Sequence, residues 1–172
     1  MTAIITKSTL ESNAYNNVFS MINDRTKVAD PRDPNGVMKR AFVYDSDPFQ
    51  KSIDFGDFPY IYVELPSGVE YSNVSVDGKV KNIGWKFNIV VRSSRDGASN
   101  TSEGLGKSDI LSIGDSLQFL FNNDAYKQEF AALRMFKMTL TKQDADDGVI
   151  DQKPVFVSSY ELVCMERITV SD

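Results

Sequence analysis

The chain has 172 residues, of which 41% are hydrophobic and 25% are charged, a composition typical of one ordinary globular domain. Its 24 acidic residues outweigh 19 basic ones, and the net charge of -5 argues against nucleic-acid binding through a generally basic surface. Histidine is absent, which excludes Ser-His and Cys-His nucleophile pairs, imidazole acid–base chemistry and mixed Cys/His zinc sites.

The N-terminus and the single cysteine restrict the setting further. Residues 1–5 lack the basic start and apolar run of a signal peptide, and no stretch approaches the ~20 apolar residues of a membrane span. Cys164 lies within an apolar run, so no internal disulfide can form and a packed thiol is expected. These features predict one domain over residues 1–172, made or assembled in a cytoplasm, without membrane association.

The first element in chain order is an amphipathic helix. Ser8 and Glu11 have the Ser-x-x-Glu spacing of a capping box. Apolar residues then recur at every fourth position: Leu10, Ala14, Val18 and Ile22. The two patterns predict a helix from about residue 9 to residue 25, with a stripe wide enough to lie across a sheet.

A long irregular excursion is expected at about residues 26–56. Pro31, Pro34 and Gly36 stand among alternating charges there and forbid regular structure. Only residues 41–44, which include Phe42 and Tyr44, offer a short extended piece. A connection of this length inside a compact domain is usually functional or mobile.

The strand that organises the predicted sheet covers residues 58–65. Its aliphatic and aromatic side chains alternate between two faces: Ile61, Val63 and Leu65 on one, Phe58, Tyr60 and Tyr62 on the other. Both faces need cover, from helices on both sides or from another subunit, because three aromatic rings in water are costly. Pro59 lacks an amide donor, so we expect it at the start of the strand or on an edge, where a neighbouring chain could dock.

A β-hairpin is expected next, with arms at residues 69–76 and 79–92. Asp77 and Gly78 tolerate the positive φ that a tight turn needs. One face of the second arm is apolar throughout: Ile83, Trp85, Phe87, Ile89 and Val91. This pattern predicts the best core strand of the chain and a buried Trp85.

The last third predicts a helix capped by Ser108 and Asp109, with a continuation through residues 126–133. Two alternating stretches then predict strands around residues 136–140 and 156–164, joined by a loop at residues 143–153. The order predicts an α+β fold, with a mostly antiparallel twisted sheet that contains a hairpin. This sheet would pack against the N-terminal helix and against a second helix between the third and fourth main strands.

Two motifs resemble ligand sites but fail on spacing. Residues 104–108 look like the end of a phosphate-binding loop, but Thr101 stands where the first glycine is required. Residues 144–151 suggest calcium, but Gly148 falls at position five and Val155 at position twelve of an EF-hand loop. The sequence therefore predicts no cofactor, no metal site, no catalytic residue and no enzyme activity.

Four aspartates give the predicted loop at residues 143–153 a local negative charge: Asp144, Asp146, Asp147 and Asp151. The turn of a β-hairpin explains this stretch better than calcium does. We expect its negative tip to face a lumen or a partner, because aspartates are costly between packed subunits unless Lys or Arg pairs with them.

The order of elements resembles that of the tail terminator proteins of long-tailed bacteriophages. The resemblance covers most of the chain and rests on the opening helix, on the strand start Phe58-Pro59-Tyr60-Ile61, and on the hairpin that ends in residues 85–91 before a helix and two strands. It implies a structural virion protein whose ring, usually a hexamer, caps the tail tube, ends its polymerisation and joins the tail to the head connector. It implies a place in the virion tail at the head–tail junction, and DNA would pass through the ring without specific binding.

A ring subunit needs side surfaces that its neighbours bury. The hypothesised subunit interface consists of aromatic residues: Phe42, Tyr44, Phe49, Phe58, Tyr60 and Tyr62. For the aromatic side of the central strand, the excursion before it is the alternative packing partner. Segments 26–56 and 143–153 are expected to be mobile in the free subunit and ordered, in part, in the assembly. Two alternatives stay open, a tail tube or neck (head-completion) ring protein, and a small cytoplasmic ligand-binding or carboxylate-dependent hydrolytic domain.

Overall fold

The computed structural model describes residues 7–24, 27–28, 42–44, 59–94, 105–150 and 153–169. In chain order the elements are α1 (Lys7–Asn23), β1 (Phe42–Tyr44), β2 (Tyr60–Val63), β3 (Ser67–Asn73), β4 (Val80–Ser94), α2 (Leu105–Asn122), the 3-10 helix η3 (Asp124–Tyr126), α3 (Lys127–Ala132), β5 (Met135–Ile150) and β6 (Lys153–Thr169). The predicted α+β class is confirmed, with a helix before the sheet and a second helix between the hairpin and the last two strands.

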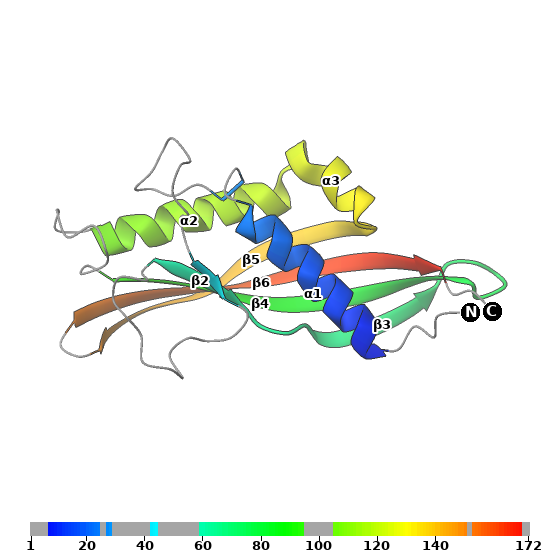
Figure 1. The fold of residues 1–172 in the computed structure, drawn as a ribbon, viewed down its shortest axis with the longest axis horizontal. Helices are drawn as coiled ribbons and strands as arrows, with labels where there is room; N and C mark the ends of the chain where they lie inside the picture. Colours follow the sequence, from blue (N-terminus) through cyan, green and yellow to red (C-terminus); the bar gives the residue numbers. More distant parts are fainter. Residues whose placement is uncertain are drawn as a thin grey trace.

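The sheet is built around two long antiparallel strands, β4 and β6. Their pairing runs from Val80↔Thr169 to Ser94↔Val155 without a register shift. The strand order is β1-β2-β4-β6-β5. β6 pairs with one edge of β4 along its whole length. On the other edge, β3 pairs with the first part of β4 and β2 with a later part. Figure 1 shows these strands running along the long axis of the molecule.

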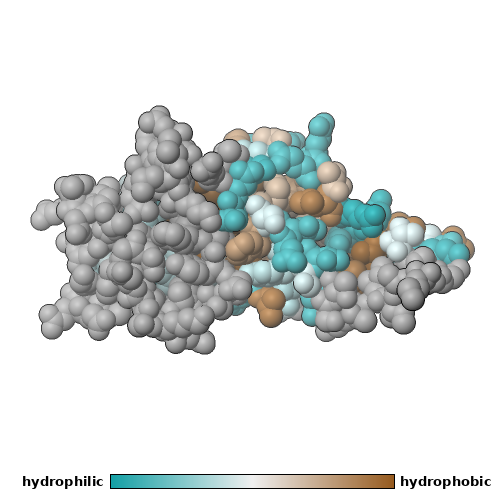
Figure 2. All heavy atoms as spheres, in the orientation of Figure 1, coloured by the Kyte–Doolittle hydropathy of each residue, from teal (hydrophilic) through white to brown (hydrophobic). Residues whose placement is uncertain are grey.

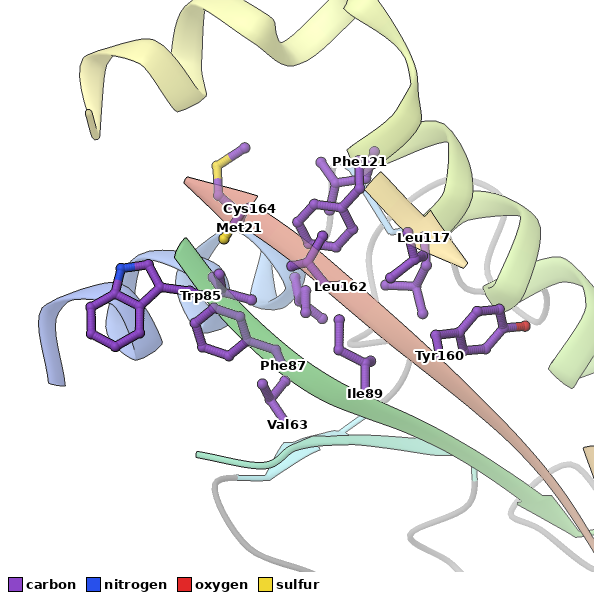
Figure 3. Packing of buried hydrophobic residues seen from close by; sticks show 14 of the residues in the cluster. Met21, Val63, Trp85, Phe87, Ile89, Leu117, Phe121, Tyr160, Leu162 and Cys164 are labelled. Atoms are coloured by element: carbon purple, nitrogen blue, oxygen red, sulfur yellow. The ribbon is translucent and has the colours of Figure 1, made fainter. Parts of the chain in front are cut away.

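The hydrophobic core lies between one face of the sheet and the helices. Alternate residues of β4 face it, each at most 1% exposed: Ile83, Trp85, Phe87, Ile89 and Val91. The predicted stripe of α1 and the apolar face of α2, which includes Ile113, Leu117 and Leu120, belong to the same cluster. Figure 3 shows Trp85, Phe87 and Ile89 in a row along β4, with Leu162 and Cys164 of β6 beside them. The predicted core strand and the predicted burial of Trp85 are confirmed.

The predicted hairpin is also confirmed, with a turn longer than two residues. The Val74 N–H donates to the Val80 carbonyl at 2.8 Å, and the Val80 N–H donates to Ser75 Oγ at 2.9 Å. Gly78 has φ +70°, the region in which residues other than glycine are strained. The Asp77 carboxylate completes the turn by accepting from the Lys79 N–H at 3.1 Å.

Three predicted boundaries need correction. β2 covers only Tyr60–Val63 and lies one strand from the edge, so β4 is the centre of the sheet. α2 begins at Leu105, which places Asp109 inside the helix, where it is buried and accepts from Ser93 Oγ at 3.3 Å. The predicted loop at residues 143–153 is mostly strand, because β5 continues to Ile150.

Most of the predicted excursion lies outside the described residues. Its extended piece is β1, which pairs in parallel with β2 through Phe42↔Tyr60 and Tyr44↔Tyr62. Lys27, just after α1, forms ion pairs with Asp24 and with Glu129 of α3. The bond to Glu129 is the main cause of the raised pKa of Lys27. This lysine therefore joins the end of α1 to α3.

Candidate interaction surfaces

The aromatic face of β2 is the first surface that the sequence singled out. Tyr60 and Tyr62 alternate with the core residues of β2 and lie on the opposite face, beside Arg92 and Val90 of β4. Arg92 Nη1 donates to the Tyr60 hydroxyl at 3.2 Å, and its guanidinium carbon lies 5.4 Å from the centre of the Tyr62 ring. Arg92 therefore holds both rings through a hydrogen bond and a cation–π contact.

The proposed role of these rings in a subunit interface needs correction. Tyr60 is 0% exposed and Tyr62 is 6% exposed within a single chain, so neither ring is available to a neighbour in this conformation. The outer edge of β2, where a neighbouring chain was expected, is occupied by β1 of the same chain. Alternation in the sequence shows that a face needs cover, but it does not show which chain provides that cover.

The other residues of the hypothesised interface are placed only in part. β1 brings the backbones of Phe42 and Tyr44 next to Tyr60 and Tyr62. Phe49 and Phe58 lie outside the described residues. The structure thus gathers four of the six positions on neighbouring strands. Among these four, Tyr60 and Tyr62 have described side chains, and both are buried within their own chain.

The acidic edge, residues 141–149 of β5, is an exposed surface. Every side chain in it is exposed, including Val149 at 71%. β5 is the last strand in the sheet order, so one edge of its backbone has no strand partner among the described residues. Charged side chains on such an edge discourage indiscriminate strand pairing. The predicted negative tip is therefore part of an edge strand, and only Asp151 lies outside the described residues.

The aspartates of the acidic edge divide between two faces of the sheet. Asp147 pairs with Phe156 and lies on the helix side, where its carboxylate contacts Lys107 Nζ of α2 at 2.9 Å. Asp144 and Asp146 pair with Ser159 and Val157 and lie on the side away from α2. Each accepts only a local N–H, from Ala145 and Asp147 respectively, at 2.8 Å. Neither forms an ion pair within the described part of the chain.

The arginine groove is a second exposed surface, where α3 meets the start of β5 and the end of β6. It has a volume of about 520 Å³ and is lined by Ala131, Arg134, Met135, Phe136, Arg167 and Thr169. The Arg167 N–H donates to the Arg134 carbonyl at 2.9 Å, which places the two arginines side by side. The Arg167 guanidinium lies 5.2 Å from the centre of the Phe136 ring. Neither arginine has an acidic partner in an ion pair within the ranges described.

Sequence reasoning missed the arginine groove because its parts are far apart in the chain. Arg134 follows α3 with φ +63°, and Lys137 has φ +50° at a register shift of β5. A second hollow of about 460 Å³ shares Ala131, Met135 and Phe136 with the groove. Arg134 and Arg167 come together only because β5 pairs with β6, and no local sequence pattern predicts that pairing.

A buried carboxyl group, that of Glu166, lies next to the arginine groove on the residue that pairs with Met135. Trp85 Nε1 donates to Glu166 Oε2 at 2.9 Å, and Glu166 is only 6% exposed. Burial raises the pKa of Glu166, while the Trp85 hydrogen bond and the charge of Arg134 oppose the rise. Burial also raises the pKa of the nearby Cys164 thiol to about 12, so this thiol stays protonated and is a poor nucleophile at neutral pH.

The described residues hold no cluster of three or more Asp, Glu, Cys or His side chains that could bind a metal ion. Of the helices that the structure describes, none has both the length and the apolarity needed to cross a membrane. Lys107, the lysine of the rejected phosphate-loop motif, is held by Asp147 and lies 5.2 Å from the Phe156 ring centre. The surfaces that stand out are therefore the acidic edge and the arginine groove.

The chain matches no protein-family model and no curated protein at a significant level. Figure 2 shows hydrophobic side chains scattered among hydrophilic ones over the described part of one face. On this face, charge and strand geometry distinguish the described surfaces more than apolar side chains do.

Proposed function

We propose that this protein is a structural subunit of a ring that caps the tail tube of a long-tailed bacteriophage. The ring would end tube polymerisation and join the tail to the head connector. The order of elements supports this proposal, since the opening helix, the strand after Pro59, the hairpin with Trp85, the helix and the last two strands follow the order of tail terminator proteins. No catalytic step is part of this role.

The length and exposure of β5 also support the proposal. β5 is a 16-residue edge strand, and its acidic edge is exposed on both faces. The aspartates discourage indiscriminate strand pairing, but the unpaired backbone groups of this edge can still pair with a chain that presents complementary charge. In a ring subunit the same edge is a surface that a neighbour covers.

The charge balance is compatible with passage of DNA through such a ring. The net charge of -5 repels phosphate groups, so a lumen lined by acidic side chains would let DNA pass without retaining it. The partners in this proposal are other copies of the chain, the tail tube protein and the head connector or neck protein.

Electron microscopy of the purified protein, combined with a size measurement in solution, tests the proposal. We expect closed rings of uniform subunit number, most simply six. Stacked or open tubes would favour a tail tube protein instead. A ring that binds the connector but does not stop tube growth would favour a neck protein.

An inert monomer that binds a small molecule would contradict all of the ring proposals. It would favour the ligand-binding or hydrolytic alternative, for which a groove of about 520 Å³ has a suitable volume. The decisive functional assay adds the protein to polymerising tail tubes. A terminator ring should stop tube growth, whereas an equal amount of heat-denatured protein should have no effect.

A further inference from the structure

The acidic edge and the arginine groove lie at opposite ends of β5. Figure 1 shows this strand running from beneath α3 towards the far end of the molecule. Asp144 stands ten positions after Arg134 in the chain, which corresponds to about 30 Å along an extended strand. The acidic edge therefore cannot reach the arginine groove of its own chain.

The chemistry of the two surfaces is complementary. Asp144 and Asp146 occupy alternate positions on one face, so their carboxylates lie about 7 Å apart. Arg134 and Arg167 are backbone-bonded neighbours whose side chains line one groove. Arginine and carboxylate form paired, charge-assisted hydrogen bonds, and two such pairs would fix both position and direction.

We propose that the acidic edge of one copy of this chain docks into the arginine groove of the next copy. This inference rests on the proposed ring function and specifies how neighbouring subunits would join. Asp144 and Asp146 of one copy would pair with Arg134 and Arg167 of the next. The contact is heterologous, since each copy offers a different surface to each neighbour, and such contacts generate rings or filaments.

A second copy suits the arginine groove better than a nucleic acid does. Two arginines make only a small basic area on a chain of net charge -5, and nucleic acid would meet repulsion over much of the remaining surface. The acidic edge instead supplies two carboxylates at strand spacing and a free backbone edge. It has no charged partner for Asp144 or Asp146 in the parts of the chain described.

Single-surface variants test this inference. The acid variant D144N/D146N and the groove variant R134Q/R167Q would each lose one surface and keep the other. We expect each variant alone to lose its rings and to sediment as a monomer. Mixed in equal amounts they should form a one-to-one dimer that does not grow, because only one intact edge and one intact groove remain. The charge-reversed variants D144R/D146R and R134E/R167E should each be monomeric alone, because edge and groove then carry the same charge. A mixture of the two should assemble with alternating subunits, because both mixed contacts join an arginine or glutamate pair to its opposite charge.

Matched controls separate this contact from general charge effects. D115N removes an exposed aspartate from α2, and K86Q removes an exposed lysine that pairs with Glu161. Both controls should form rings like the unchanged protein. The quadruple charge swap D144R/D146R/R134E/R167E, which exchanges the two charges in one chain, should also form rings. Thermal unfolding of each variant shows whether it is folded. The single variant R167Q is a further control, because it keeps Arg134, whose charge acts on the buried Glu166.

The outcomes distinguish failure of this inference from failure of the proposed function. If the unchanged protein forms rings and both double variants form them equally well, the proposed ring function stands and this contact is wrong. If the contact forms but gives open filaments, the inference holds and the capping function fails. A protein that is monomeric at every concentration contradicts both. Loss of DNA binding by R134Q/R167Q with unchanged assembly would assign the groove to nucleic acid and overturn the inference.

Discussion

At the scale of single residues, the bond between Trp85 and Glu166 joins the apolar core to a buried carboxylate. Alternation along β4 predicted the burial of Trp85 correctly, since its neighbours at every second position are apolar. The partner of its indole N–H could not be predicted, because Glu166 lies on β6 and meets Trp85 only through the pairing of two distant strands. Partners of this kind depend on register, which a local pattern does not contain.

Replacing Trp85 tests the two parts of its contribution. Trp85→Ala should lower the free energy of unfolding by about 3–5 kcal/mol, as for other large buried aromatics. Trp85→Phe keeps most of the ring but leaves the Glu166 carboxylate without its donor, which should cost about 1–3 kcal/mol. Urea unfolding measures both values. Native tryptophan fluorescence with the emission of a fully hydrated indole would contradict the placement of Trp85.

Glu166 should make stability depend on pH. Its folded-state pKa is raised above the ordinary value of 4.5, chiefly by burial. Below that ordinary value the carboxyl is protonated in both states and costs nothing. As the pH rises above it, the unfolded state loses its proton first, so stability falls until the pH passes the raised folded-state pKa.

Glu166→Gln should remove this pH dependence while keeping an acceptor for the Trp85 N–H. The variant should gain stability relative to the unchanged protein as the pH rises from 4 to 8, roughly the interval over which a raised carboxyl pKa acts. Thermal melts across that range measure the effect. Glu161→Gln is the control, because Glu161 is part of an exposed pair with Lys86 at 3.1 Å and should give little change. A difference between variant and wild type that does not vary with pH would refute the prediction.

At the scale of elements, the packing of α2 on β6 depends on a close approach at Gly114. Tyr160 of β6 is buried, and a Cβ added at Gly114 would collide with its hydroxyl and lie 3.2 Å from the ring carbon that bears it. Glycine is unfavourable inside a helix by about 1 kcal/mol relative to alanine. Its use here lets the helix lie against the tyrosine.

Gly114→Ala should therefore destabilise the protein by about 1–3 kcal/mol despite the better helix propensity of alanine. The same substitution in a Tyr160→Phe background should cost clearly less, because the colliding oxygen is gone. A double-mutant cycle of unfolding free energies measures the coupling. Equal costs of Gly114→Ala in the two backgrounds would show that α2 does not approach β6 at this point.

The elements also show where sequence patterns stop being informative. The period-four stripe of α1 and the alternation of β4 located both elements, because each buries one continuous face. The acidic edge was predicted as a loop, since its Asp- and Gly-rich composition is typical of turns. It is a strand because β6 offers partners as far as Lys153, so backbone pairing overrides local preference. The arginine groove had no local signal at all.

At the scale of the whole molecule, the acidic edge should respond to assembly. In the free subunit the outward amides of residues 141–149 have no strand partner among the described residues, so they should exchange hydrogen quickly. In the proposed rings a neighbour would cover this edge, and exchange should slow. Hydrogen exchange followed by mass spectrometry, on subunits and on rings, measures the difference. Residues 89–91 of β4 serve as an internal control, since they are paired with β2 and with β6 in either state.

Equal protection of the acidic edge in subunits and rings would mean that this strand does not contribute to the interface. The earlier expectation of a mobile loop would predict rapid exchange at every amide of residues 143–150. An edge strand instead predicts alternation, because amides that point towards β6 are protected in the free subunit as well. The pattern along β5 therefore also separates the two descriptions of this segment.

The long pairing of β4 with β6 sets the order in which a newly made chain can fold. Val80 meets Thr169 and Ser94 meets Val155, so the central ladder joins segments separated by α2, α3 and β5. A ribosome must release β6 as far as Thr169 before the whole of that ladder can close. Pairing across such sequence distances is slow, typically milliseconds to seconds, and leaves β4 with an open apolar face in the meantime. A stalled or truncated chain that lacks β6 should therefore aggregate. The refolding yield of the full chain should fall steeply as the protein concentration rises.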